Sequence, residues 1–419
     1  MLNIKHIIAN PKEVEEKLRK KDPSVTLAPL ISAYKEFAET KSLYDMKKAE
    51  ANSAAKEIGE AVQKKLDPSP IKARMGALKQ EISELEHRTD SFEKKYLSLL
   101  AQLPNLPFDD IPYSFDPKDN VCIKTYKDKP EKGPHFLNHL EMGAKHDLFS
   151  LEMGARITGS GWPVYKNMYP RIELALIQLM INIHVKNGFE VISTPYVVSE
   201  ETMYGSGQLP KFKEQVYKLD EEHPLYLIPT SEVSLNGIYQ DTIFRNEELP
   251  KFMTTFSPCF RREAGSHGKN ERGLIRIHQF HKVELFAITT PDKSNDAFEK
   301  ILASAEEVLQ TLGLHYRNML LVTGDMSFAS SKTVDIEVWL PGQDRYYEVS
   351  SISNCTDFQA RRSKIRYKRE NIVEPVHTLN GSGLALPRLM VALLENFQDS
   401  EGNFTPPACL QPFLSLGII

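Results

Sequence analysis

The stretch that decides the fold is FRREAGSHGKNERGLIRIHQFHKVELF, residues 260–286. Both of its ends are rich in strand-forming residues, and its polar centre holds Gly265, Gly268 and Gly273. This order predicts a strand at 254–263, a long loop and a return strand at 274–286. Because side chains alternate along a strand, we expect Arg261 and Glu263 on one face of the first strand.

The return strand is unusual for the groups that it gathers on one face. The same alternation places there Arg276, His278, Phe280, Lys282 and Glu284. Cations, carboxylates and an aromatic ring together are costly to bury without a partner. They suit a nucleotide, because arginine pairs with phosphate and a carboxylate accepts a hydrogen from an exocyclic amine. A solvent-facing strand laced with ion pairs explains the pattern as well, so the residues alone leave that alternative open.

The rest of the C-terminal region mixes strands with helices. Strand-like runs lie at 189–193, 225–228, 320–323, 334–340 and 346–350, and residues 172–185 have the pattern of a buried amphipathic helix. Most of these runs are not separated by regular crossover helices. We therefore predict an α+β fold, in which a mainly antiparallel sheet is covered by helices.

The region from 27 to 103 is poor in aromatic residues and carries an apolar repeat of four and three. The second half follows this repeat closely, whereas the first half has lapses at Lys41 and Lys48. The repeat positions are Leu30, Tyr34, Phe37, Tyr44, Ala51, Ala55, Ile58 and Val62, then Ile71, Met75, Leu78, Ile82, Leu85, Thr89, Phe92, Tyr96, Leu99 and Leu103. Such a seam predicts two long helices in an antiparallel coiled-coil hairpin, with a turn at 67–70.

This hairpin has a basic tip. The tip has an excess of three positive charges, because it carries six cations (Lys56, Lys64, Lys65, Lys72, Arg74, Lys79) and three carboxylates (Glu57, Glu60, Asp67). Lysines of a thin arm can neutralise nucleic-acid phosphates. A dimerisation coiled coil or a simple spacer is the alternative, since charged tips also keep coiled coils in solution.

Proline and aspartate mark a connector after the hairpin. We therefore expect three segments: an N-terminal helical arm at 1–103, a connector at 104–134 and a sheet domain at 135–419. Near the C-terminus, Gly381, Ser382 and Gly383 allow a tight backbone before a helix that starts near Pro387 and Arg388. The spacing of a Walker loop is absent.

Composition sets limits on the function. The 419 residues carry a net charge of only −4, so any nucleic-acid site is a local patch. Four scattered cysteines form no metal-binding pair, which favours free thiols in a reducing compartment. The N-terminus has no signal-peptide core, and no apolar run is long enough to span a membrane. The expected location is the cytoplasm.

Several long motifs, in order, resemble class II aminoacyl-tRNA synthetases. The helix and strand that end at Pro195 resemble motif 1, residues 260–286 resemble motif 2, and residues 383–388 with their helix resemble motif 3. Finer text resembles the seryl-tRNA synthetase family, namely residues 104–107, 207–212, 228–232, 265–266, 272–276, 278–280, 348–362 and 379–383. The resemblance covers essentially the whole chain.

The resemblance implies a site for ATP. Arg261 is implied to hold the α-phosphate, Glu263 to accept from the adenine amino group, and Phe280 and Arg388 to enclose the adenine. Arg261 and Arg388 are the implied catalytic residues. The implied ATP-binding set comprises Arg261, Arg262, Glu263, Ile277, Phe280, Glu348, Val349, Ser350, Ser351 and Arg388.

The resemblance also implies a magnesium ion that bridges the phosphates and is held by Glu348 and Ser351. These two residues are three apart, so a regular strand cannot present both on one face. We therefore expect a β-bulge or a strand end near Ser350. No cysteine–histidine zinc set is visible, and no zinc is expected.

A serine site is implied in the same cleft. Thr230, Ser231 and Glu232 are implied to meet the amino group, and Glu284 the side-chain hydroxyl. The implied serine-binding set is Thr230, Ser231, Glu232, Arg261, Glu284, Asn354 and Ser382. Alanine lacks only the hydroxyl, so a buried Glu284 left unpaired would reject it. Taken alone, Glu232 could equally be a helix-start carboxylate and Glu284 a member of a strand ion pair.

Implied function and partners follow from the same family. The resemblance implies activation of L-serine to seryl-adenylate and its transfer to the 3′-end of tRNA(Ser), with tRNA(Sec) as a further substrate where one exists. It implies a homodimer in which the arm grips the long variable arm of the tRNA. Arg262 and Pro387 depart from the residues common in the family. Two alternatives are a catalytically silent RNA-binding paralogue and a ligase that loads a carrier protein.

Overall fold

The computed structural model describes residues 1–130, 136–264 and 273–415. The chain forms two compact units, residues 2–103 and residues 104–419, the second of which also includes Met1. We call them the arm unit and the sheet unit. No helix of the described residues is long and apolar enough to cross a membrane.

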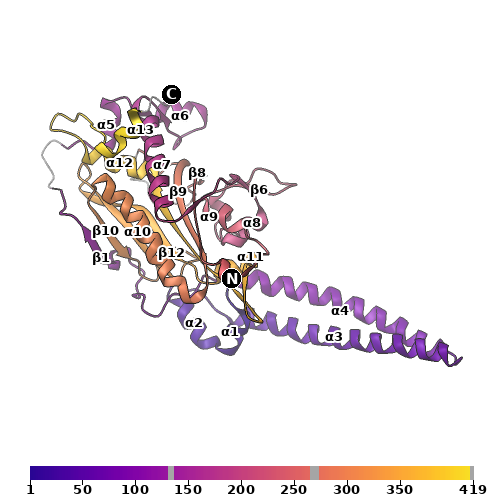
Figure 1. The fold of residues 1–419 in the computed structure, drawn as a ribbon. Helices are drawn as coiled ribbons and strands as arrows, with labels where there is room; N and C mark the ends of the chain where they lie inside the picture. Colours follow the sequence, from indigo (N-terminus) through magenta and orange to yellow (C-terminus); the bar gives the residue numbers. More distant parts are fainter. Residues whose placement is uncertain (131–135, 265–272, 416–419) are drawn as a thin grey trace. The chain divides into compact units, whose positions relative to one another are not determined.

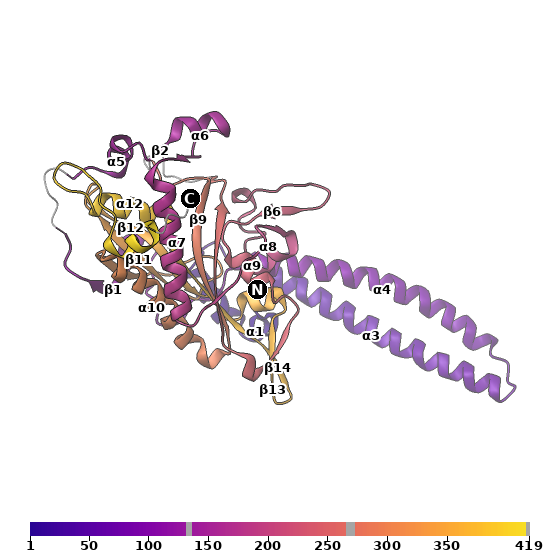
Figure 2. The same cartoon turned by 45° about the horizontal axis from the view of Figure 1, so that its top comes forward.

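The arm unit is helical, as predicted. It begins with two short helices, α1 (Ile4–Ala9) and α2 (Pro11–Arg19), followed by the long helices α3 (Ala28–Gln63) and α4 (Ser69–Ala101). The two long helices pack side by side over their length (Figures 1 and 2). The predicted turn is confirmed, since α3 ends before it and the Asp67 side chain accepts a hydrogen bond from the Ser69 amide.

The predicted apolar seam is right for α4 and drifts on α3. Near the base, Tyr96 packs against Tyr34 and Phe37, with ring centroids 5.4 and 4.9 Å apart. Toward the tip the buried residues of α3 are Ala54 and Ala61. The predicted seam residues Ala55 and Val62 are instead exposed. A straight helix drifts against a seven-residue repeat, so the buried face moves back by one residue.

The sheet unit contains one large sheet, in the order β1-β10-β11-β12-β15-β9-β8-β4. Neighbouring strands are antiparallel except for β4 and β8, which confirms the predicted antiparallel sheet. The strands are β1 (Val121–Tyr126), β4 (Glu190–Val191), β8 (Lys251–Phe260), β9 (Gln279–Thr289), β10 (Tyr316–Leu320), β11 (Lys332–Leu340), β12 (Arg345–Asn354) and β15 (His377–Ala385). Since β1 pairs with β10, part of the predicted connector belongs to this sheet.

Helices α7 (Met168–Lys186), α10 (Ser294–Leu312) and α12 (Leu386–Asn396) pack on the large sheet (Figure 1). Their apolar faces and the inward residues of the strands form one core cluster. The remaining helices are α5 (His139–Lys145), α6 (Leu151–Ile157), α8 (Glu200–Ser206), α9 (Glu232–Gly237), α11 (Phe358–Ser363) and α13 (Gln411–Ser415), with short 3-10 turns at 117–119, 213–215, 246–248, 291–293 and 408–410.

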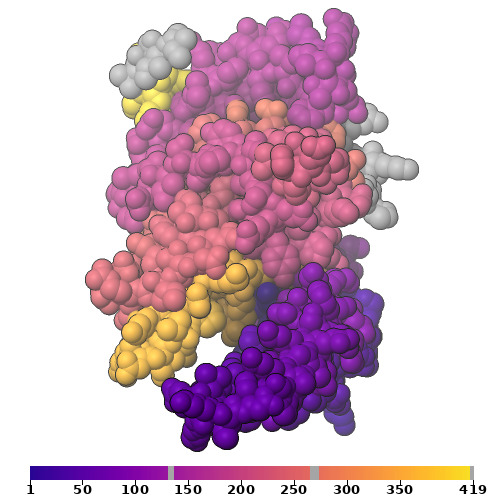
Figure 3. Space-filling model, turned by 90° about the vertical axis from the view of Figure 1, so that its right-hand side faces the viewer, coloured from indigo at the N-terminus to yellow at the C-terminus, as the bar shows by residue number. Residues whose placement is uncertain are grey.

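Smaller sheets lie beside the large one. The pairs are β2 (Phe149–Ser150) with β3 (Val164–Tyr165) and β5 (Val197–Ser199) with β6 (Leu225–Leu227). A third sheet has the order β14 (Ile372–Pro375), β13 (Arg366–Arg369) and β7 (Ile243–Arg245). The β13–β14 hairpin is the orange-yellow lobe at the surface in Figure 3.

The prediction that Arg261 and Glu263 share a strand face was wrong. Strand β8 ends at Phe260, and Glu263 has a left-handed backbone with φ of 52°, which cannot continue a strand. The return strand also starts late, so Arg276 and His278 precede β9, whereas Phe280 lies within it. Most of the predicted loop, including Gly265 and Gly268, lies outside the described residues.

The glycines of 381–383, which were expected to allow a tight backbone, lie within strand β15. Gly383 is the extra residue of a β-bulge, because Ser382 pairs with Glu284 and Leu384 with Val283. A β-carbon on Gly383 would collide with the ring of His184, so the bulge requires glycine here. The helix start near Pro387 is confirmed, with proline in the first turn of α12.

Candidate active site

The first of two adjoining cavities has a volume of about 330 Å³ and opens over strands β9, β12 and β15. Its walls combine carboxylates, cations and hydroxyls with a few apolar side chains. The lining residues are Ser206, Gly207, Gln208, Phe212, Gln215, Val216, Pro229, Thr230, Glu232, Arg261, Lys282, Glu284, Ser327, Phe328, Ala329, Glu348, Ser351, Ser353, Asn380 and Ser382. Residues far apart in the sequence therefore meet around one space.

Glu284 is a buried lining residue of this cavity. It is 1% exposed and forms an ion pair with Lys282, two residues earlier on the same face of β9. Thr230 donates its hydroxyl to Glu284 at 3.0 Å and accepts from Lys282 Nζ at 2.8 Å. Burial raises the pKa of Glu284, and the nearby Lys282, Thr230 and Arg261 oppose this rise. The cavity thus holds an acceptor that is already partly paired and fully dry.

A second carboxylate, Glu232, enters from the first turn of α9. Its side chain accepts hydrogen bonds from Gln359 and, at 3.0 Å, from Asn380. Burial, together with the negative charge of Glu284, raises the pKa of Glu232 to about 7. Glu232 therefore titrates near neutral pH, and a cation bound beside it would favour its charged form.

The second cavity has a volume of about 190 Å³. Its lining residues are Gln215, Arg261, Glu263, Leu274, Ile275, Arg276, Ile277, Phe280, Lys282, Glu348, Ser382, Ala385, Pro387 and Arg388. Five of these residues also line the first cavity, so the two spaces form compartments of one cleft: Gln215, Arg261, Lys282, Glu348 and Ser382.

Arg261 stands between the compartments. Its guanidinium lies over the Phe280 ring, 5.1 Å from the centroid, and its Nε donates to the Pro229 carbonyl at 3.3 Å. On the far side, Arg276 Nε lies 2.7 Å from a carboxylate oxygen of Glu263. The second cavity therefore presents an aromatic face, a paired carboxylate and guanidinium groups, a set that matches the parts of a nucleotide.

The bulge expected near Ser350 is confirmed at Val349. Strand register pairs Glu348 with Glu337 and Ser350 with Ile336, which leaves Val349 as the extra residue. As a result, Glu348 and Ser351 both line the first cavity. Arg388, from the first turn of α12, forms an ion pair with Glu348 at 3.0 Å.

The surroundings of Ser351 are suited to a hard cation. Asp335 lies directly opposite Ser351 on β11, and its Oδ1 is buried with no hydrogen-bond partner in the described part of the chain. Burial and the charge of Glu348 raise the pKa of Asp335. Oxygen donors of this kind are those that Mg²⁺ prefers. Among the described residues, no group of three or more His, Cys, Asp or Glu could hold a metal ion.

Most residues implied by the sequence line the cleft, but five do not. Asn354 donates to the Ser294 hydroxyl at 2.9 Å, and the buried Ser231 hydroxyl pairs with Ser257. The remaining three are Arg262, Val349 and Ser350, none of which lines either cavity. Val349 is excluded by the bulge itself, which turns its side chain into the core.

The sequence reasoning also missed groups that line the first cavity. Lys282 had been placed on the right strand face, yet no binding role had been given to it. Asn380 lies two residues before Ser382 on β15, so alternation along that strand could have identified it. Gln215, which lines both cavities, comes from the 3-10 turn at 213–215 and has no period-two signal.

Two family models match the chain. "Seryl-tRNA synthetase N-terminal domain" matches residues 1–107, and "tRNA synthetase class II core domain (G, H, P, S and T)" matches residues 212–397. A serine–tRNA ligase of Chlamydia pneumoniae is 46% identical over 416 residues, which cover 99% of this chain and 97% of the relative. A serine–tRNA ligase of Campylobacter hominis is 41% identical and covers 99% of this chain and 100% of the relative.

Solved structures agree with these relatives. Seryl-tRNA synthetase from Pyrococcus horikoshii, crystallised with ATP, has a TM-score of 0.90 at 32% identity and covers 99% of this chain and 98% of its own. Cytoplasmic serine–tRNA ligase from Naegleria fowleri, in complex with AMP, has a TM-score of 0.84 at 28% identity over 97% and 95% of the two chains.

Proposed function

The chain belongs to the seryl-tRNA synthetase family of serine–tRNA ligases, and from this premise we propose how its cleft activates serine and loads tRNA. In the first reaction, L-serine and ATP give seryl-adenylate and pyrophosphate. In the second reaction, the 3′-terminal ribose hydroxyl of tRNA takes the seryl group and AMP leaves. The observation that carries the proposal is the wall shared by the two cavities, where Arg261 stands between a dry carboxylate pocket and a guanidinium-rich one.

The first cavity is proposed to bind serine. Glu284 accepts the side-chain hydroxyl, and Glu232 with Thr230 takes the ammonium group. Glu284 is buried and Glu232 is partly buried, so competition from water is weak, most of all at Glu284. Ser382 and Asn380 close the same space, and Asn380 also keeps the Glu232 side chain in place. Alanine would leave the Glu284 acceptor without its partner, which is costly in a dry site.

The second cavity is proposed to bind ATP. Phe280 and Arg388 enclose the adenine, Glu263 accepts from its amino group, and Arg261 holds the α-phosphate next to the serine carboxylate. That carboxylate is already ionised near neutral pH, so adenylate formation needs no general base. Arg261 both positions the two reactants and stabilises the charge that develops on the α-phosphate.

A magnesium ion fits the oxygen donors around the bulge at Val349. Glu348 and Ser351 are the proposed protein ligands, and phosphate oxygens of the nucleotide complete the coordination. When bound, the ion neutralises phosphate charge during the displacement of pyrophosphate. In the structure Glu348 is paired with Arg388. Binding of nucleotide would release Arg388 toward the adenine and Glu348 toward the cation.

The arm unit is proposed to bind tRNA. Its six tip cations are all exposed, and two of them are paired: Arg74 with Glu50 and Glu57, and Lys64 with Glu60. The others extend the basic surface along the hairpin. The proposed substrate is tRNA(Ser), and tRNA(Sec) is a second substrate if its variable arm fits this hairpin.

A homodimer formed through residues 168–197 is the remaining part of the proposal. Leu174, Val185, Val191, Tyr196 and Val197 are exposed apolar side chains of α7, β4 and the start of β5. Exposed apolar residues gathered on neighbouring elements are typical of a subunit interface. Mass measurement of Val191→Asp in solution is expected to show a monomer. The four free cysteines suit the cytoplasm, where the proposed substrates meet.

Amino-acid-dependent exchange of pyrophosphate into ATP, tested with all twenty amino acids, examines the activation step. Serine alone is expected to support rapid exchange. If no amino acid supports exchange, the chain is instead a catalytically silent RNA-binding paralogue. The arm is tested separately with Lys64→Glu/Lys65→Glu/Lys72→Glu, which should charge tRNA at least about tenfold more slowly and leave exchange unchanged. Equal charging by this variant would contradict the role of the arm.

A further inference from the structure

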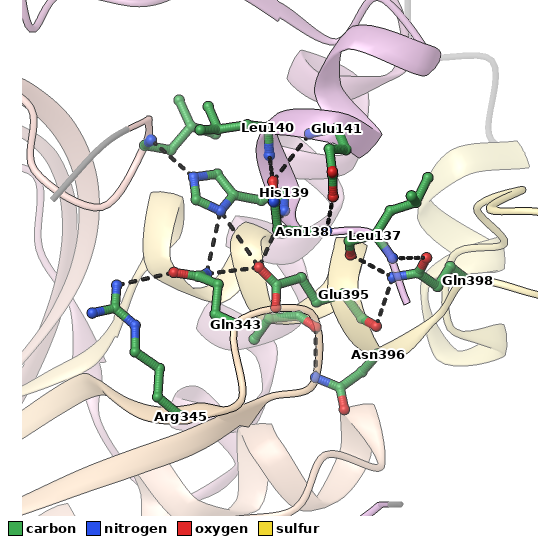
Figure 4. Close-up of polar contacts among 12 residues, drawn as sticks. Leu137, Asn138, His139, Leu140, Glu141, Gln343, Arg345, Glu395, Asn396 and Gln398 are labelled. Atoms are coloured by element: carbon green, nitrogen blue, oxygen red, sulfur yellow. Dashed lines mark hydrogen bonds and ion pairs between the residues drawn. The ribbon is translucent and has the colours of Figure 1, made fainter. Parts of the chain in front are cut away.

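A buried polar cluster lies next to Leu274, which lines the second cavity, and none of its residues has a role in the reaction described above. His139, the first residue of α5, is 2% exposed, and Glu395, near the end of α12, is fully buried. The His139 amide donates to Glu395 Oε1 at 3.1 Å, and His139 Nδ1 lies 3.4 Å from the same oxygen. Gln343 Nε2 donates to that oxygen at 2.7 Å (Figure 4).

The cluster has a defined direction, which follows from its donors. Arg345 donates to Gln343 Oε1 at 2.9 Å, so the amide nitrogen of Gln343 must face Glu395. At the other end, the Leu274 amide donates to His139 Nε2 at 3.4 Å. Gln343 Nε2 also lies 3.3 Å from His139 Nδ1, so the ring contacts Gln343 and Glu395 on one side and the Leu274 amide on the other. The series Arg345–Gln343–Glu395–His139 therefore ends on a backbone amide of the return segment.

The return segment is pressed closely against this histidine. Gly273 has φ of 79°, and a β-carbon there would collide with His139 Nε2 and with Leu140. The imidazole ring thus touches two successive residues of the backbone, one through close packing and one through a hydrogen bond. His139 therefore contacts the return segment at residues 273 and 274.

This backbone leads directly into the second cavity. Leu274, Ile275, Arg276 and Ile277 all line that cavity, and Arg276 forms the ion pair with Glu263. The cluster reaches two further walls of the cavity. Helix α12 carries Arg388 in its first turn and Glu395 near its end, and the turn that contains Gln343 leads into β12, the strand of Glu348.

We propose that His139, Glu395 and Gln343 form a positioning set that holds the return segment 274–277 in the geometry required by the nucleotide. The set links the return segment, helix α12 and the turn before β12, each of which leads to lining residues of the second cavity, and none of its three residues lines the first cavity. It is therefore expected to act on ATP without acting on serine. The inference rests on the proposed nucleotide role of that cavity.

The primary test compares His139→Phe with His146→Phe by pyrophosphate exchange. His146 follows the same helix and its Nε2 lies 2.8 Å from the Gly402 carbonyl, away from Leu274 and Glu395, and neither histidine lines either of the two cavities. His139→Phe keeps a flat ring of similar size and removes the acceptor for the Leu274 amide. KM for ATP is expected to rise about tenfold, and KM for serine to change by less than about twofold. His146→Phe should leave both constants unchanged.

A double-mutant cycle provides a second measurement, for the case in which His139→Phe does not fold. Gly273→Ala forces a methyl group against the His139 ring, and should raise KM for ATP. In a His139→Ala background the ring is absent, so the same change should cost at least about threefold less. Glu395→Gln keeps the accepting Oε1 and should remain within about threefold of the wild type, whereas Glu395→Ala should behave like His139→Phe.

The possible outcomes distinguish failure of the positioning role from failure of the proposed serine-activating function. A wild-type enzyme without serine-dependent exchange would remove the proposed function itself. With exchange established, equal rises of KM for ATP and serine in His139→Phe would overturn the positioning role. A lower Tm with both constants unchanged would show that the cluster contributes only to stability.

Discussion

The two compartments of the cleft share a wall, yet their functional groups are held in opposite ways. In the first cavity, Glu284 and Thr230 are almost completely buried, and Glu284 projects from the middle of a regular strand. In the second cavity, the side chains of Glu263, Arg276, Glu348 and Arg388 keep between 19% and 39% of their surface exposed. They come from strand ends, a bulge and the first turn of a helix.

This difference teaches how selection and turnover can be separated within one site. A dry carboxylate fixed by a strand discriminates strongly, because an imperfect partner leaves it unpaired. Half-exposed ion pairs cost little to exchange, so they can be replaced by phosphate and metal when the nucleotide binds. The first cavity should therefore control which amino acid reacts, and the second should control ATP and its cation.

The shared wall should show the largest effect. Arg261→Ala removes the cation between the two compartments, and exchange is expected to fall about a thousandfold, mainly in kcat. Arg262→Ala is the matched control, because the Arg262 side chain lines neither cavity. The hydrogen bond from the Arg262 backbone amide to the Gln215 carbonyl is kept in this variant. An Arg262→Ala variant as impaired as Arg261→Ala would remove the distinction between the two arginines.

The first cavity should respond next. Glu284→Ala is expected to lower kcat/KM for serine about a hundredfold or more, and to reduce the preference for serine over alanine. Buried Lys282 loses its ion-pair partner in this variant, so the fall in stability should be measured by Tm beside the kinetics. KM for ATP is expected to stay within about threefold. If the variant still prefers serine over alanine, another residue must select the amino acid.

The second cavity should respond through its cation. Glu348→Gln keeps the shape of the side chain and removes the charge that a magnesium ion and Arg388 both use. The Mg²⁺ concentration for half-maximal exchange is expected to rise about tenfold, with KM for serine nearly unchanged. An unchanged magnesium requirement would argue against Glu348 as a ligand.

The smallest expected effect is the pH dependence of KM for serine, which should differ from that of KM for ATP. Because the pKa of Glu232 is raised to about 7, the residue loses its charge as pH falls through that value. KM for serine should then rise by up to about tenfold per pH unit below 7, and KM for ATP should stay flat. A flat KM for serine between about pH 6 and pH 8 would show that Glu232 does not meet the ammonium group.

Glu232→Gln provides the corresponding stability measurement. Since the folded pKa lies above the ordinary value, ionisation of Glu232 destabilises the fold as pH rises through about 7. The glutamine variant avoids this cost and should gain about 1 to 3 kcal/mol at pH 8, measured by chemical unfolding. The gain should disappear near pH 4, below the ordinary pKa of the carboxyl, where Glu232 is protonated in both the folded and the unfolded chain.

Local patterns in the sequence predicted much of this structure. The four-three repeat gave both long helices and their turn, because a coiled coil is specified by near neighbours along each helix. The spacing of Glu348 and Ser351 required a bulge, which lies at Val349. Alternation placed Phe280, Lys282 and Glu284 on one strand face, and all three line the cleft.

The same local rules failed where other parts of the chain decide the backbone. Alternation was extended too far at Glu263, whose left-handed φ ends the strand and turns its carboxylate toward Arg276. The glycines at 381–383 were expected only to allow a tight backbone, and it is the structure that shows Gly383 in a bulge against His184, a residue about two hundred positions earlier. Asn354, which the resemblance implies for the serine site, donates to Ser294 and does not line either cavity.

By itself, the sequence determined the helical arm, the antiparallel sheet and the kinds of side chain that form the cleft, because periodicity and residue chemistry are properties of short stretches. Only the tertiary structure decided which of those side chains share a compartment, which carboxylates are dry, and how His139 reaches the return segment. Those features depend on distances between residues far apart in the chain, and such distances are fixed when the sheet and its helices pack.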